Sequence, residues 1–150
     1  MSKLTITPDQ LQFMDDLAAL LLPWGMTNGV ARLYACLLIQ EQPISLDEIC
    51  AALEISKSTA SVSARTLEQS KLVKRHRVKG TKRVLYSAVN DTAATVADHA
   101  TMQGNLASLL LKNANLSDSD LVINRLQHMA DFCLTMQQVM EAAIRERQAE

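Results

Sequence analysis

The chain has 150 residues, of which 48% are hydrophobic and only 3% aromatic, and its formal net charge is −1. This length usually forms one domain with a buried core, and so few aromatic residues argue against a base-stacking platform or a carbohydrate cleft. The longest apolar run, Leu17–Trp24, is too short to cross a bilayer, and the N-terminus lacks a signal-peptide core. We therefore expect a cytoplasmic protein with no membrane partner, and three widely spaced cysteines agree with a reducing compartment.

The charge is distributed unevenly along the chain. Residues 56–83 contain 9 of the 15 Lys and Arg residues and a single acidic residue. Residues 1–55 carry 2 basic and 7 acidic residues, and residues 84–150 carry 4 basic and 8 acidic residues. A concentrated positive charge raises the local attraction for polyanions without making the whole protein basic. The pattern predicts a polyanion-binding surface, with a merely solvated basic surface as the alternative.

Two helices are expected in the acidic N-terminal segment. Thr7 can cap a helix over about residues 8–22, and Gln10 can complete a capping box. The apolar stripe of this helix is expected at helical spacing, on Phe13, Leu17, Leu20 and Leu21. Pro23, Gly25 and Asn28-Gly29 are expected to break this helix, and a second, largely buried helix is expected over about residues 30–40.

Two short helices should follow, separated by a tight turn. Ser45 and Glu48 form a second capping box, which opens a helix that ends near Leu53. Ser56 can cap the next helix, which should run to about Ser70. The buried positions of this helix are predicted three or four residues apart, at Ala60, Ala64 and Leu67. Its other face carries short hydroxyl side chains and cations, which suits contact with a partner.

The periodicity changes after this helix. Residues 72–78 and 83–89 are rich in β-branched and long side chains. They flank the sequence Lys79-Gly80-Thr81-Lys82, in which the glycine can supply a turn. A β-hairpin with a strongly basic tip is therefore predicted.

Two long helices are expected in the C-terminal part of the chain. Asn90 or Asp91 can cap the first, which should end near Lys112, and Ser117-Asp118-Ser119-Asp120 opens the last. Along the last helix, apolar residues recur with gaps of four and three, at Val122, Leu126, Met129, Cys133, Met136, Met140 and Ala143. This period of 3.5 residues is typical of a two-helix seam. We expect the seam to pair two subunits, with packing inside one subunit as the alternative.

Together these elements predict a mainly α-helical fold with a small β-hairpin wing. Residues 1–28 would contribute to a dimer layer, residues 29–90 would form a winged helix-turn-helix domain, and residues 91–150 would form a helical pair for dimerisation. The second short helix would enter the DNA major groove, where short hydroxyl side chains allow close approach, and the basic hairpin would meet the neighbouring backbone or minor groove. The residues expected to contact double-stranded DNA are Ser56, Lys57, Ser58, Thr59, Ser61, Arg65, Arg75, Arg77, Lys79, Lys82 and Arg83.

The segment Ser45–Arg75 resembles the helix-turn-helix of MarR-type regulators. The stretches Leu21–Ile39 and Val78–Ala88 are most similar to the GbsR-like branch of that family. The resemblance implies a homodimeric, ligand-responsive transcription regulator, usually a repressor. A two-fold dimer would present two reading helices about one DNA turn apart, so the operator should be an imperfect palindrome.

Three positions depart from the family pattern. Glu54 stands where glycine is common in the inter-helix turn, Val62 stands where arginine is common, and Val84-Leu85 replaces a more polar, aromatic pair. These departures concern the DNA sequence that is read and leave the binding mode unchanged. Some GbsR-like proteins respond to choline, but quaternary ammonium is usually bound by an aromatic cage. This chain has few aromatic residues, so that ligand is not transferred.

Regulation could come from a small effector between the dimer layer and the winged domains, because such a ligand would change the spacing of the reading helices. The residues expected to line this pocket are Trp24, Met26, Tyr34, Met102 and Phe132, with ordinary core packing as the alternative. A winged-helix module that binds a protein partner, and no DNA, is the second functional interpretation.

Catalytic and metal sites are not predicted. No CxxC or HExxH motif occurs, and His76, His99 and His128 have no partner at ligand spacing. The sequence also lacks a phosphate-binding glycine loop and a nucleophile elbow. We therefore expect no enzymatic activity and no cofactor. Cys36 and Cys133 are expected in the core, whereas Cys50, beside the reading helix, is a candidate redox-sensing thiol.

Overall fold

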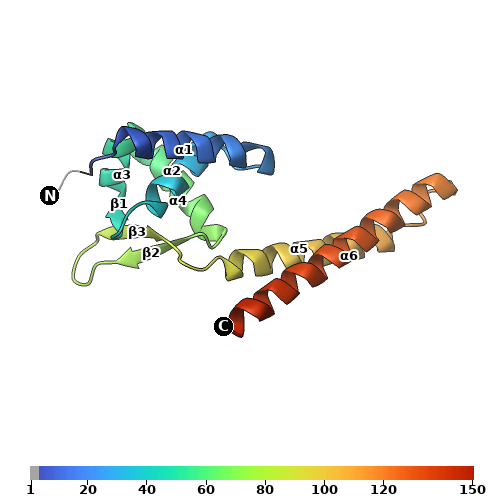
Figure 1. The fold of residues 1–150 in the computed structure, drawn as a ribbon. Helices are drawn as coiled ribbons and strands as arrows, with labels where there is room; N and C mark the ends of the chain where they lie inside the picture. The colour runs from blue at the N-terminus through green and yellow to red at the C-terminus, as the bar shows by residue number, and fades with distance from the viewer. Residues whose placement is uncertain (1–3) are drawn as a thin grey trace. The chain divides into compact units, whose positions relative to one another are not determined.

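The computed structural model describes residues 4–150. The chain divides into two compact units, of which unit 1 ends at Asn90 and unit 2 comprises Asp91–Glu150 (Figure 1). Unit 1 contains the short helices and the β-sheet, and unit 2 consists of the two long helices. Each unit has a hydrophobic core of its own.

Helix α1 (Pro8–Leu21) begins at the predicted capping box. The Thr7 hydroxyl accepts a hydrogen bond from the Gln10 N–H, and the Gln10 side chain accepts one from the Thr7 N–H. These two bonds satisfy backbone donors that a helix start otherwise leaves unpaired. The core-facing side of α1 is centred on two buried residues, Met14 and Ala18.

The apolar stripe predicted for α1 was wrong at two positions. Phe13 and Leu20 are 41% and 71% exposed, whereas Leu17 and Leu21 are half-buried. The helix packs on α2 through the side that bears Met14 and Ala18. Phe13 and Leu20 lie on a neighbouring side of the helix and are therefore exposed. Helix α1 therefore carries apolar side chains that unit 1 leaves uncovered.

Helix α2 (Asn28–Leu38) starts two residues earlier than predicted. The Thr27 hydroxyl caps it, so Asn28-Gly29 forms its first turn and does not interrupt the chain. The break predicted at Pro23 and Gly25 is confirmed, because a short 3-10 helix, η1 (Leu22–Trp24), ends at Gly25. Gly25 has a φ of 90°, a left-handed conformation that glycine adopts without steric cost. Helix α2 contacts α1, α4 and the sheet, which explains why most of it is buried.

Helices α3 (Leu46–Leu53) and α4 (Lys57–Gln69) form the predicted helix-turn-helix pair. The Ser45 hydroxyl accepts a hydrogen bond from the Glu48 N–H at the start of α3, and Ser56 caps α4 in the same way. Both predicted helix starts are confirmed. The pairs α3–α4 and α2–α4 are in contact, so α4 is supported on its inner side by two helices.

The sheet of unit 1 is larger than predicted. Strands β2 (Val73–Arg77) and β3 (Val84–Ala88) form the predicted antiparallel hairpin. A third strand, β1 (Ile44–Ser45), pairs with β3, so the strand order is β1-β3-β2. The two residues of β1 are too few to show a strand periodicity, because alternation needs four or more residues to be visible. The consequence is that the hairpin is anchored to the residue that caps α3.

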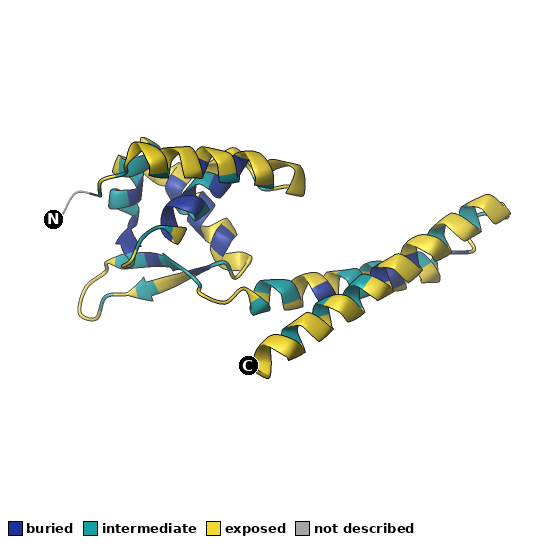
Figure 2. Cartoon of the chain, in the orientation of Figure 1, coloured by how far each residue is buried: buried dark blue, intermediate teal, exposed yellow. Residues whose placement is uncertain are grey.

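The core of unit 1 lies between the helices and the sheet, where Figure 2 shows the buried segments. Every helix of the winged domain and both longer strands contribute to it. The large side chains at its centre are Met14, Leu33, Leu37, Ile49, Leu67, Val73 and Tyr86. This shared core fixes α4 and the hairpin relative to each other.

Unit 2 is a pair of helices, α5 (Ala93–Lys112) and α6 (Asp120–Gln148). The Asp91 carboxylate accepts a hydrogen bond from the Ala93 N–H at the start of α5. Ser119 caps α6 as predicted, accepting a bond from the backbone of its first turn. The two helices pack against each other along their length.

The seam predicted along α6 is used inside the chain. Cys133 is buried in a small cluster with Ala107 of α5 and Ala130 of α6, so its packing follows the alternative, inside one subunit, and the pairing of two subunits stays a prediction. The stripe is also only partly inward, since Met129 is 49% exposed. Helix α5 of the same chain covers this part of α6.

The predicted fold class is confirmed, because the chain is mainly helical and carries a small antiparallel sheet as the wing of a helix-turn-helix. Within residues 4–150, no helix combines the length and the apolar character that a membrane span requires.

Candidate nucleic-acid interface

Helix α4 buries one side and exposes the other. The buried positions are those predicted from the spacing, since Ala60, Ala64 and Leu67 are fully buried. Five of the six DNA-contact residues predicted on α4 and its cap are exposed, namely Ser56, Lys57, Ser58, Thr59 and Arg65. The sixth, Ser61, is half-buried. The exposed side is thus polar, carries two cations and has few bulky side chains, as insertion into a groove requires.

Hydroxyl groups organise the amino end of α4. Ser56 Oγ accepts a hydrogen bond from the Thr59 N–H at 3.1 Å and donates one to Thr59 Oγ1 at 2.8 Å. Ser58 Oγ lies 3.2 Å from Ser56 Oγ. The amino end of a helix carries a partial positive charge and attracts a phosphate. The same hydroxyls therefore start the helix and present polar groups where a DNA backbone would lie.

Val62 is an exposed position that the sequence reasoning treated only as a departure from a family pattern. Its side chain is 60% exposed, on the outer side of α4 between Ser58 and Arg65. An apolar side chain in a major groove can contact the methyl group of thymine. The sequence contains a signal for this position, because Val62 is apolar but does not share the helical spacing of the buried residues Ala60, Ala64 and Leu67.

The basic residues of β2 are divided between the two faces of the sheet. Arg75 pairs with the buried Tyr86, so Arg75 and Arg77 share the core-facing side and reach solvent along the open edge of the sheet. His76 lies on the opposite face, where its Nε2 is 2.7 Å from Ser87 Oγ. Both predicted contact residues of this strand, Arg75 and Arg77, are exposed.

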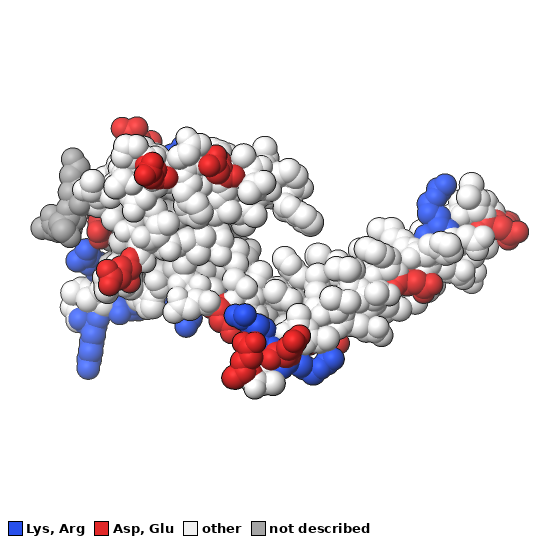
Figure 3. All heavy atoms as spheres, viewed as in Figure 1, with Lys and Arg blue, Asp and Glu red and all other residues white. Residues whose placement is uncertain are grey.

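The turn of the hairpin is held by its own polar groups. The Thr81 N–H donates to the Val78 carbonyl at 3.1 Å, and the Arg83 N–H donates to Thr81 Oγ1 at 3.1 Å. Gly80 has a φ of 82°, which a side chain would strain. Lys79 and Lys82 flank this turn and are exposed. Figure 3 shows Lys and Arg atoms at this end of unit 1 and Asp and Glu atoms over α1.

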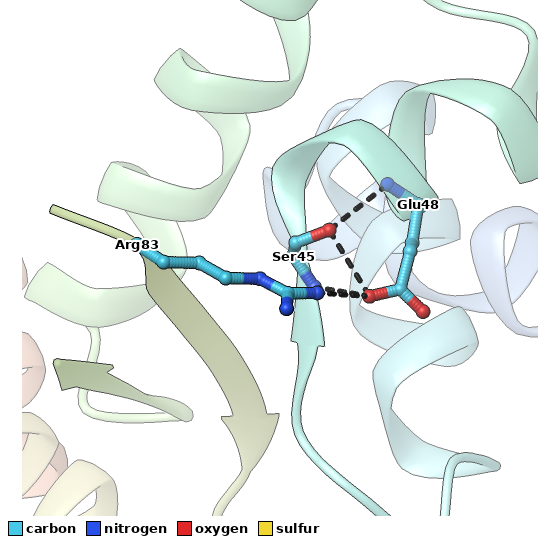
Figure 4. Close-up of polar contacts among 3 residues, drawn as sticks. All are labelled: Ser45, Glu48 and Arg83. Carbon is cyan, nitrogen blue, oxygen red and sulfur yellow. Dashed lines mark hydrogen bonds and ion pairs between the residues drawn. The ribbon is translucent and has the colours of Figure 1, made fainter. Parts of the chain in front are cut away.

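Arg83 is engaged with α3, which the sequence did not predict. Its Nη2 donates to Glu48 Oε1 at 3.5 Å, and the same oxygen accepts hydrogen bonds from the N–H and the hydroxyl of Ser45 (Figure 4). The Glu48 side chain is 19% exposed, so this carboxylate is held on several sides. Arg83 consequently ties the base of the wing to the cap of α3, in addition to lying in the basic surface.

Lys57 also has an acidic partner on α3. Its Nζ lies 3.4 Å from Asp47 Oδ1, and both side chains are about 70% exposed, at 72% and 69%. Two of the predicted DNA-contact cations are therefore paired with neighbouring carboxylates at the start of α3.

Comparison with known proteins agrees with this geometry. Residues 30–84, from α2 to the start of β3, match the model of the MarR family. This segment is similar to the winged-helix domain of that family. No curated protein sequence matches the chain significantly.

One solved structure extends the likeness of the fold beyond residues 30–84. A structure described as a transcriptional regulator matches with a TM-score of 0.83 and 24% identity, covering 95% of this chain and 100% of that chain. A structure of a mutant of ZitR from Lactococcus lactis matches with a TM-score of 0.38 and 19% identity, over 76% of this chain and 75% of that chain. The first match shows a shared fold, and the second is too distant to support an argument.

The residues predicted to line an effector pocket fall in both units. In unit 1, Trp24 is 86% exposed, whereas Met26 and Tyr34 pack at the edge of the core of this unit. Burial raises the pKa of the Tyr34 hydroxyl above its ordinary value. In unit 2, Met102 and Phe132 are 55% and 67% exposed. The pocket itself stays a prediction.

The cysteines differ in accessibility. Cys36 is buried in the core, and this burial raises its thiol pKa to about 11, with a smaller opposing effect from Arg32. Cys50 is half-buried, and burial together with the nearby Asp47 carboxylate raises its pKa. The positive charge of Lys57 lowers this pKa by a smaller amount. A raised pKa lowers the fraction of reactive thiolate at neutral pH. Among residues 4–150, no cluster of three or more His, Cys, Asp or Glu side chains could hold a metal ion.

Proposed function

We propose that the chain is a DNA-binding transcription regulator whose helix α4 reads the major groove while the β2–β3 hairpin contacts the flanking DNA. The observation that carries this proposal is the exposed polar side of α4, mounted on a buried Ala60–Leu67 side next to a hairpin that bears Lys79 and Lys82. The matching structure described as a transcriptional regulator supports the same function.

Specific reading would come from few side chains. Lys57 and Arg65 are long enough to reach base edges, and Val62 can contact a thymine methyl group. The hydroxyl residues at the start of α4 contact phosphates or any base, so they position the helix more than they select a sequence. We expect a specific site in which one or two base pairs per half-site dominate the selectivity.

The proposed regulator acts as a homodimer on an imperfect palindrome. The support is the apolar surface that a single copy of unit 2 leaves open, since the buried residues of its core cluster, Ala107, Ala130 and Cys133, are small. The exposed apolar residues of α5 and α6 include Met102, Leu109, Leu121, Met129, Phe132 and Val139. Large exposed apolar patches mark sites of association, and a second copy with the same patch would cover them through a two-fold interface.

Repression, release by a small effector and membership of the GbsR-like branch complete the proposal. The resemblance of Leu21–Ile39 and Val78–Ala88 to that branch supports all three. The side chain best placed to report an effector is Trp24, which is exposed and is the one tryptophan of the chain. Titration of candidate metabolites should change the Trp24 fluorescence together with DNA affinity, and a Trp24→Phe variant with unchanged release would remove Trp24 from the sensor.

The first experiment is an electrophoretic shift with random duplex DNA at low salt. We expect the logarithm of the binding constant to fall linearly with the logarithm of the salt concentration, because phosphate contacts release counterions. Replacing Lys79 and Lys82 by alanine should weaken binding on all sequences alike and reduce the salt slope by about 0.9 for each phosphate contact that is lost. Lys112→Ala, outside the winged domain, is the matched control.

The same experiment decides between DNA and a protein partner. If the wild-type protein ignores duplex DNA at low ionic strength, the winged domain would serve as a protein-interaction module instead. Selection of bound duplexes from a random pool would then give no enriched site, whereas a regulator should enrich two half-sites about one helical turn apart.

A further inference from the structure

The start of α4 has an unusual charge for a helix. Its first turn carries Lys57 and no acidic residue, although the partial positive charge of a helix amino end disfavours cations. Helix α3 follows the ordinary preference, with Asp47 and Glu48 in its first turn. Helix stability therefore does not explain the presence of Lys57 at this position.

Lys57 forms an exposed ion pair with Asp47, which another anion can replace. Lys57 Nζ contacts Asp47 Oδ1 at 3.4 Å, and about 70% of each side chain is exposed. Exposed single-contact ion pairs contribute little and are readily screened. A DNA phosphate at the start of α4 would occupy the same region as the Asp47 carboxylate, since both are anions attracted to Lys57 and to the helix end.

The second ion pair differs in this respect. Arg83 contacts Glu48, whose carboxylate is 19% exposed and already accepts two hydrogen bonds from Ser45 (Figure 4). Glu48 is thus fixed by the capping box of α3, and Arg83 joins a site that exists without it. Of the two carboxylates, Asp47 is the one whose bond to its cation can be exchanged without disturbing a helix start.

We propose that Asp47 is an internal competitor of the DNA backbone: it holds Lys57 in the free protein, gives it up to a phosphate in the complex, and so lowers DNA affinity. This inference rests on the proposed DNA-binding function and identifies an affinity-determining residue outside the DNA-contact surface. It also implies that the wild-type salt dependence is shallower than the number of basic contacts alone would give, because an uncompensated carboxylate remains in the complex.

The test is fluorescence anisotropy with a labelled duplex of random sequence and the full chain. Asp47→Asn should tighten binding about twofold to fivefold at low salt, the range expected for release of one exposed ion pair. It should also steepen the plot of log affinity against log salt by up to about 0.9, the contribution of one phosphate contact. Glu54→Gln is the control, since it removes one negative charge in the turn before α4 without breaking any ion pair among residues 4–150.

A double-variant cycle isolates the pair itself. In a Lys57→Ala background, Asp47→Asn should change affinity no more than Glu54→Gln does, because no cation is left to release. An equal gain with and without Lys57, a gain no larger than that of the control, or a loss of affinity would overturn the proposal. Failure of the wild-type protein to bind any duplex would overturn the proposed function as well, so the two failures are distinguishable. Circular dichroism of Asp47→Asn verifies that α3 is intact.

Discussion

At the scale of single residues, the helix-turn-helix contains two non-glycine residues in left-handed backbone conformations. Glu54, between α3 and α4, has a φ of 55°, and Lys71, after α4, has a φ of 63°. Residues other than glycine pay a steric cost in this region. At Glu54 the conformation is enforced, because the N–H groups of Glu54 and Ile55 both donate to the Cys50 carbonyl to end α3.

Glu54→Gly should therefore stabilise the protein. We expect a gain in the free energy of unfolding of about 1 kcal/mol, as relief of left-handed strain exceeds the entropy that glycine adds to the unfolded chain. Chemical denaturation followed by circular dichroism measures it. The control is Glu68→Gly, the same substitution inside α4, which should cost about 1 kcal/mol. A destabilised Glu54→Gly protein would show that the turn is not strained.

Cys50 should react slowly with alkylating agents at neutral pH. Burial and the neighbouring Asp47 hold its pKa above the ordinary value, so the thiolate is a small minority at pH 7. In a Cys36→Ala, Cys133→Ala protein, the alkylation rate should rise about tenfold per pH unit from pH 7 to 8, as the thiolate fraction does below a thiol's pKa. A rate that is already constant with pH over this range would restore the redox-sensing hypothesis for Cys50.

At the scale of elements, α5 and α6 approach each other through small residues. The buried cluster consists of Ala107, Ala130 and Cys133, and Gly104 lies against the side chain of Gln137, where a Cβ atom would come within 2.5 Å of the amide nitrogen. Close approach of two helices leaves no room for larger side chains. Small residues bury little apolar surface, so the core of unit 2 is thin and many of its apolar residues stay exposed.

Ala130→Leu should separate the two helices. Overpacking of a tight core usually costs about 1–3 kcal/mol, so the thermal midpoint of the protein should fall. Calorimetry measures the change, with Gln127→Leu, an exposed position on the same helix, as the control that should stay near wild type. An Ala130→Leu protein as stable as this control would mean that the α5–α6 contact is loose in solution.

At the scale of the whole molecule, both units leave apolar side chains in solvent. Phe13, Leu20 and Trp24 are exposed in unit 1, and Met129 and Phe132 are exposed in unit 2. A soluble monomer rarely leaves so much apolar surface open. The proposed dimer explains this distribution, because it would place the uncovered helical faces in contact with a second copy.

Phe132→Glu should shift the protein from dimer to monomer. A charged residue at the centre of an apolar interface weakens association by about 2 kcal/mol or more, which is more than tenfold in the dissociation constant. Light scattering coupled to size-exclusion chromatography measures the mass over a range of concentrations. Gln138→Glu adds the same charge at an exposed polar position of α6 and should leave the mass unchanged. Wild-type protein that is monomeric at all concentrations would contradict the homodimer.

The local structure of this protein follows from short-range signals in its sequence. Caps such as Thr7, Ser45, Ser56 and Ser119 set the helix starts, and the change of period after α4 identified the hairpin, because these signals act within a few residues. The clustering of basic residues in 56–83 likewise placed the candidate interface without any knowledge of contacts.

Which face of each helix meets which partner depends on the packing of the folded chain. The rotation of α1 toward Met14, the use of Cys133 inside the α5–α6 pair and the strand β1 all depend on segments distant in sequence. The same holds for the ion pairs that Lys57 and Arg83 make with α3. Periodicity shows that a face is apolar or charged, but the neighbour that covers or neutralises it is set by packing of the whole chain.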